Sequence, residues 1–133
     1  MQEIKNQEEL SAWVREQFQK ANKHLAENQI LFDSVVTEES RYLAPHVAVW
    51  KIKDKTGSFY WVVSGDLPTD YVAINVADTA RAAMKHFSLS WQMTSENLKR
   101  SANGDTEQEK FAKRLQTGAE NLYDVAVNEK AWQ

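Results

Sequence analysis

The sequence contains no cysteine, and its 133 residues include only two prolines and four glycines. Without a thiol, no disulfide, thiolate zinc site, iron–sulfur cluster or catalytic cysteine can form, and a cysteine-free chain fits a reducing cytoplasm. The glycines are scattered at positions 57, 65, 104 and 118, so no glycine-rich loop is available to hold nucleotide phosphates. The sequence therefore predicts a protein without a cofactor.

Long apolar runs and a surplus of positive charge are also missing. No stretch approaches the roughly 18 apolar residues of a membrane-spanning helix, and the opening MQEIKNQEELSAW lacks the apolar core of a secretory signal. The net charge is −3, whereas binding to a nucleic-acid backbone depends on clustered Lys and Arg. We therefore expect a cytoplasmic protein that binds neither membrane nor nucleic acid.

Aromatic residues, in contrast, are plentiful, with five Trp, five Phe and four Tyr. A chain of this length fits one domain, and its aromatic side chains can build a core without metals or disulfides. The prediction is a single domain over residues 1–133.

Three segments have the three-and-four spacing of apolar residues that is typical of amphipathic helices. The first covers 8–28, the second about 76–100 with Asn75 as its cap, and the third about 106–129, beginning at Asp105 or Thr106. The second segment carries an additional apolar stripe beside its main one, which predicts contacts on two sides; this stripe consists of Ala82, Leu89 and Met93.

A β-hairpin is predicted over 46–64, because two runs rich in aromatic and β-branched residues surround the turn sequence DKTG. If Lys53 faces Ser58 across a four-residue turn, Trp50 and Trp61 face each other on the core side of the sheet. The second side then carries a mixture suited to a partly exposed surface: Val47, Val49, Lys51, Tyr60, Val62 and Ser64.

The predicted fold class is therefore α+β. It consists of an N-terminal helix, a small antiparallel sheet of two or three strands, and two long C-terminal helices that cover one sheet face. The third strand is placed near 34–39.

Residues 64–71, SGDLPTDY, bring together a glycine, a proline, two carboxylates and two aliphatic hydroxyls within eight positions. Asp66 and Asp70 would bind a hard cation or act as an acid and base if their side chains converged. Asp and Thr beside Gly and Pro are also ordinary turn formers, and this structural interpretation is the favoured one.

Catalysis and metal binding have little support in the sequence. The three histidines, His24, His46 and His86, are far apart and have no metal-ligand spacing, so no metal site is predicted. A Ser64, His46 and Asp66 triad would need converging side chains and an oxyanion hole. No catalytic residue is predicted.

Aromatic residues with a polar end favour binding surfaces, and Tyr60 and Tyr71 are the best candidates near the acidic turn. The predicted binding residues are Ser64, Asp66, Thr69, Asp70, Tyr71, Tyr60 and His46.

Several segments together resemble a family of small bacterial proteins of unknown function. They are YLAP at 42–45, AVWKI at 48–52, WVVSGDLPTDY at 61–71 and HFSLSWQ at 86–92. The resemblance covers most of the chain and implies a free-standing bacterial cytoplasmic protein. It implies no activity or catalytic residues, because the family has none assigned.

The favoured functional prediction is a non-catalytic protein-binding or regulatory domain. It would contact a partner protein or a second copy of itself through the second side of the hairpin and residues 64–71. One alternative is a small enzyme or ligand binder with its site at 64–71. Another is a toxin-neutralising immunity protein, by analogy with other small acidic bacterial domains.

Overall fold

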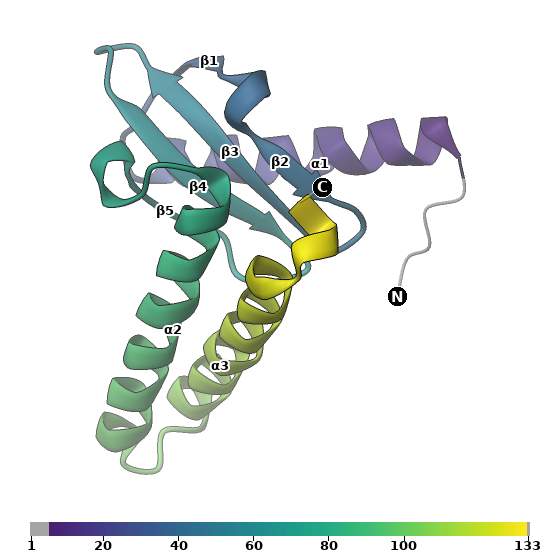
Figure 1. Cartoon of the computed structure of the whole chain (residues 1–133). Coiled ribbons are helices and arrows are strands. Elements are labelled where there is room, and N and C mark those ends of the chain that lie inside the picture. Colours follow the sequence, from purple (N-terminus) through teal and green to yellow (C-terminus); the bar gives the residue numbers. More distant parts are fainter. Residues whose placement is uncertain (1–5, 133) are drawn as a thin grey trace. The chain divides into compact units, whose positions relative to one another are not determined.

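The structure is a computed structural model that describes residues 6–132. Its class is α+β, as predicted (Figure 1). The chain divides into two compact units, one ending at Ala83 and one beginning at Met84, with the boundary inside a helix. Each unit is described by itself, and the single domain over 1–133 stays a prediction.

The first unit begins with helix α1, Gln7–Glu27, close to the predicted 8–28. Asn6 caps it, since its Oδ1 accepts a hydrogen bond from Glu9 N at 2.9 Å. The helix crosses one face of the sheet (Figure 1). Its buried side chains join sheet residues in one core cluster that contains Trp13, Ala21, Leu25, Ala48, Trp50, Ile52 and Val62.

The sheet of the first unit has five antiparallel strands, more than the two or three expected. They are β1 Phe32–Val35, β2 Arg41–Leu43, β3 Val47–Asp54, β4 Phe59–Gly65 and β5 Asp70–Ala73. Strands β1 and β2 pair with opposite ends of β3, and β4 and β5 follow on its other side. The strand expected near 34–39 ends at Val35, and a 3-10 turn, η1 Thr37–Glu39, leads into β2.

The predicted hairpin register is wrong by one residue. Lys53 pairs with Phe59 rather than Ser58, because Asp54 extends β3 and donates its N–H to Ser58 O at 2.8 Å. The turn therefore has three residues and ends at Gly57, whose φ of +93° is the left-handed geometry that such turns require.

The corrected register places Trp50 and Trp61 on opposite faces of the sheet. Trp50 pairs with Val62 and faces α1, while Trp61 pairs with Lys51 and donates its Nε1–H to Ala77 O at 2.8 Å. The surface that we expected to be partly exposed does not exist as one face. Four of its six expected members are at most 1% exposed: Val47, Val49, Val62 and Ser64.

In the second unit, α2, Ala80–Ala102, packs antiparallel against α3, Thr106–Val127, as a helical hairpin. Ser88 Oγ donates to Ala119 O at 2.8 Å and Ser95 Oγ donates to Ala112 O at 2.7 Å. The two bonds are seven residues apart on both helices. Whether this pair covers one sheet face stays a prediction.

The helix starts differ in one case from expectation. Asn75 lies in a 3-10 turn, η2 Ile74–Val76, and Thr79 caps α2 instead, with its Oγ1 accepting from Ala82 N at 3.1 Å. Of the two predicted starts for α3, Asp105 is the observed cap, because Oδ1 accepts from Glu107 N at 3.0 Å and from Gln108 N.

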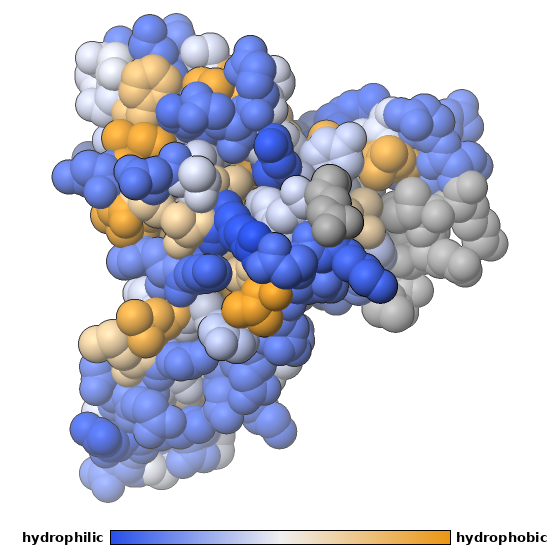
Figure 2. Space-filling view, in the orientation of Figure 1, coloured by the Kyte–Doolittle hydropathy of each residue, from blue (hydrophilic) through white to orange (hydrophobic). Residues whose placement is uncertain are grey.

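The second apolar stripe of α2 does not make the expected contacts on its own side. Leu89 is 59% exposed and Met93 is 60% exposed. Figure 2 shows that apolar residues form separate patches on a mostly hydrophilic face. Between residues 6 and 132, no helix is both long and apolar enough to cross a membrane.

Candidate functional site

Residues 64–71 form the connection between β4 and β5, with Asp66 to Thr69 outside the strands. The sequence folds tightly here because Gly65, with φ +142°, lies against the start of β3. A Cβ at this position would lie 2.4 Å from His46 O and 2.9 Å from Val47 Cα. Asp66 N also donates to His46 O at 3.0 Å, so glycine allows the two backbones to meet.

Ser64 is fully buried and is occupied by structural hydrogen bonds. Its Oγ accepts from Trp50 Nε1 at 3.1 Å and donates to Gln17 O at 2.9 Å. The hydroxyl proton is thus directed into α1, while His46 is exposed and meets Asp66 through its backbone carbonyl. This geometry does not bring Ser64, His46 and Asp66 together as a triad.

The two carboxylates of the connection have different positions. Asp66 is exposed, whereas Asp70 begins β5 and its Oδ1 accepts from Tyr71 N at 2.8 Å, a bond typical of turns. Thr69 is half-buried beside Asp70. No group of three or more His, Asp or Glu that could hold a metal ion occurs within residues 6–132.

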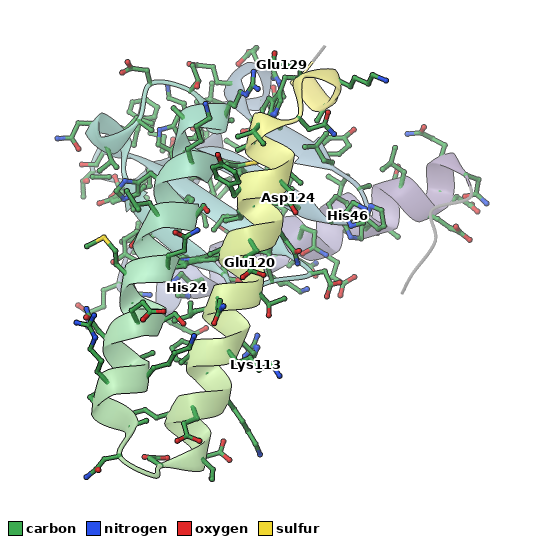
Figure 3. The ribbon with its side chains drawn as sticks, turned by 60° about the horizontal axis from the view of Figure 1, so that its bottom comes forward. His24, His46, Lys113, Glu120, Asp124 and Glu129 are labelled. Carbon is green, nitrogen blue, oxygen red and sulfur yellow. The ribbon has the colours of Figure 1, made fainter. Side chains whose placement is uncertain are left out.

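The structure does bring the two predicted tyrosines together, and it adds α1 residues that we had not associated with them. The Tyr60 and Tyr71 ring centroids lie 5.9 Å apart, and His24 meets Tyr71 at 5.7 Å. Lys20 Nζ also donates to Gly65 O at 3.4 Å. The only sequence signal for this contact is that Lys20 and His24 lie one turn apart; His46 lies well away from His24 (Figure 3).

A separate feature of the first unit, missed in the sequence, is an apolar groove of about 340 Å³ between α1 and strands β1 to β3. Helix α1 contributes two parallel rows of side chains, each spaced by four residues. We call this feature the α1 groove; its apolar row is Leu10, Val14 and Phe18, its polar row is Gln7, Ser11 and Arg15, and its sheet wall is Val35, Tyr42 and Trp50.

Aromatic contacts shape the α1 groove. The Phe18 ring packs edge-on against Trp50, with centroids 5.4 Å apart, and Trp13 approaches Tyr42 at 6.3 Å. Tyr42 is nevertheless 47% exposed. The N-terminal turns of α1 reach past the short strand β2 (Figure 1), which leaves the apolar row incompletely covered.

Arg15 places a positive charge on the rim of the α1 groove. It is exposed, and the neighbouring positions on the helix surface hold Ser11, Ala12, Phe18 and Gln19, none of them acidic. No carboxylate of residues 6–132 forms an ion pair with it. Because a guanidinium stays charged at every physiological pH, this rim is permanently cationic.

The sequence did carry a signal for the α1 groove. The apolar residues of α1 cover a broad arc of the helix surface. Three of them, Trp13, Ala21 and Leu25, are buried in the core cluster. Leu10, Val14 and Phe18 belong to the same arc, but they are only half-buried. What the sequence did not reveal was a wall opposite them.

A second, polar pocket of about 230 Å³ lies within the helical hairpin, and Glu120 on its wall is labelled in Figure 3. Its polar side chains form hydrogen bonds with one another and with Lys99. Gln116 accepts from Lys99 Nζ and donates Nε2–H to Glu120 Oε1 at 3.3 Å. This internal network makes it a weaker candidate than the α1 groove.

Comparison with known proteins adds one result. Neither the curated proteins nor the solved structures include a match to this chain. A family model described as a domain of unknown function, DUF4826, matches residues 7–132, which include the α1 groove and the connection at 64–71. Because the match covers nearly the whole chain, the protein belongs to this family of unknown function, DUF4826.

Proposed function

We propose that the protein is a non-catalytic binding domain that holds an apolar segment of a partner protein in the α1 groove. The observation that carries the proposal is the groove's composition, an apolar row beside a polar one, opposite an aromatic wall. Protein interfaces have this arrangement of an apolar centre and a polar rim. The partner is a protein rather than a nucleic acid, which the net charge of −3 would repel.

The structural hydrogen bonds of two candidate reactive groups at 64–71 support binding rather than chemistry. The Ser64 hydroxyl serves Trp50 and Gln17, and Asp70 serves the backbone of Tyr71. In this proposal the connection is a structural support that fixes β4 and β5 against α1, and the binding surface moves to the other end of the helix.

The proposed setting is the bacterial cytoplasm. A chain without cysteine suits a reducing compartment, and the resemblance to small bacterial proteins agrees with it. Fractionation of bacteria that express the tagged chain would test this setting, and recovery from the periplasm or the envelope would contradict it.

The α1 groove can be tested with the dye 1-anilinonaphthalene-8-sulfonate, whose fluorescence rises on apolar protein surfaces. The full chain should enhance it, and Val14→Glu should weaken dye binding at least about fivefold by placing a charge in the apolar row. Ser11→Trp, at an exposed position, blocks the same groove without disturbing the core.

Gln19→Glu is the matched control, because it introduces the same charge at an exposed position of α1 outside the groove lining. Circular dichroism should show all variants folded. Dye binding that is equal in the parent, Val14→Glu and Ser11→Trp would contradict the proposal.

A further inference from the structure

We infer that the α1 groove receives an amphipathic helix of the partner protein, oriented by a carboxylate on that helix that meets Arg15. This inference rests on the proposed function and adds the chemistry of the partner. It is carried by the two rows of α1 and by the exposed charge of Arg15 at the end of one of them, with which no carboxylate of residues 6–132 forms an ion pair.

The apolar row has the geometry of a helix-packing ridge. Leu10, Val14 and Phe18 follow one another at intervals of four residues and so span about 12 Å along α1. Ridges with this spacing fit the grooves of a second helix. A partner helix of two or three turns, with apolar side chains at i, i+4 and i+7, would fill this length.

The polar row supplies the specificity. It runs beside the ridge and ends at Arg15, whose flat guanidinium can donate two parallel hydrogen bonds to a carboxylate. A glutamate on the edge of the partner's apolar stripe would complete this rim. A lysine at the same place would meet a like charge, which disfavours the complex.

Two other occupants fit less well. A second copy, related by a two-fold axis, would bring the row of Gln7, Ser11 and Arg15 against itself, and this row contains no carboxylate. A small amphiphile would remain largely exposed in a groove that is open along its length, whereas small-molecule pockets bury about 70–90% of their ligand.

The test uses the full chain and two alanine-based helical peptides that carry the same leucine stripe. One has a single glutamate beside the stripe, and the other has lysine at that position. The glutamate peptide should bind about two- to fivefold more tightly, the range expected of an exposed ion pair. Arg15→Glu should reverse this preference, and Lys23→Glu, an exposed charge reversal elsewhere on α1, should leave it unchanged.

The outcomes separate this inference from the proposed function. One outcome is that both peptides bind equally, Arg15→Glu has no effect and Ser11→Trp still blocks binding. In that case Arg15 does not select a carboxylate on the partner, but the α1 groove is still the binding site. If neither peptide binds and Ser11→Trp binds the dye as strongly as the parent does, both proposals are wrong. If dodecanoate binds in an Arg15-dependent way and neither peptide binds, the occupant is a small amphiphile rather than a helix. If the chain self-associates and thereby covers the groove, the occupant is a second copy.

Discussion

The two units of the chain both use buried serine hydroxyls that donate to helix carbonyls, but in different settings. In the first unit a single hydroxyl, that of Ser64, joins β4 to α1 across 47 positions of sequence and also accepts from Trp50. In the second unit Ser88 and Ser95 repeat the same bond at an interval of seven residues.

The difference concerns redundancy. Seven residues are close to two helical turns, so the helical hairpin can repeat one contact along its length. Loss of Ser88 or Ser95 removes one of two equivalent hydrogen bonds and leaves the other in place. In the described part of the sheet unit, from residue 6 to Ala83, the Ser64 bond is not repeated, and Ser64 alone links Trp50 to Gln17 of α1. Substitutions should therefore have larger effects in the first unit than in the second.

The largest effect is expected at Gly65. In Gly65→Ala the new methyl group would collide with His46 O and Val47 Cα, and the residue would also hold φ +142°. We expect a loss of about 3 kcal/mol or more in the free energy of unfolding, measured by urea denaturation with tryptophan fluorescence.

Gly57→Ala is the matched control, since Gly57 also has positive φ but its Cβ would meet open space. It should cost about 1 kcal/mol through backbone strain alone. Equal losses for the two variants would show that the close approach of β3 and β4 is relaxed in solution.

The second prediction compares the serines directly. Ser64→Ala removes the hydroxyl that accepts from the buried Trp50 Nε1–H and should cost about 1–3 kcal/mol. Ser95→Ala removes a donor to Ala112 O, a carbonyl inside α3, and leaves no donor without a partner. It should cost about 0.5–1 kcal/mol in the same urea measurement.

A Ser95→Ala loss as large as that of Ser64→Ala would contradict the argument from redundancy. Ser58→Ala, at an exposed position directly after the hairpin turn, removes only a long contact with Thr56 Oγ1 at 3.4 Å and serves as the reference for serine removal.

The smallest expected effect is the pH dependence of the hairpin turn. The Thr56 hydroxyl, 2.7 Å from Asp54 Oδ1, and then the N–H groups of Ser58, Thr56 and Gly57 hold the pKa of Asp54 below its ordinary 3.8, against the opposing effect of burial. Because the folded state has the lower pKa, this stabilisation is complete above 3.8 and is lost as the pH falls through the folded value.

The stability difference between the parent and Asp54→Asn, followed from about pH 6 to pH 3, should therefore be constant at first and then shrink. A difference that grows on acidification would have the wrong sign. The measurement also tests the register, since Asp54 has these partners only in the observed three-residue turn.

Local sequence patterns were enough for the helices. The prediction of 8–28 differs from α1 by one residue at each end, because an amphipathic period and a polar cap are both encoded nearby. The start of α2 was placed too early, since Asn75 and Thr79 are both good caps and Asn75 lies in the η2 turn that precedes the helix.

The sheet and the candidate site were harder to predict. The hairpin was found, but Asp54 was assigned to the turn, and this one residue placed Trp50 and Trp61 on opposite faces of the sheet instead of the same face. At 64–71 we identified the special residues, while the burial of Ser64 depends on Gln17, which lies far away in the sequence.

The sequence by itself determined the α+β class, the three helices and the central hairpin, because each depends on residues within a few turns of one another. Tertiary structure alone decided that Ser64 is buried against α1, which tryptophan faces α1 and that a groove opens beside Arg15. These features arise where α1 meets strands that follow it in the chain, and no local periodicity specifies which side chains meet there.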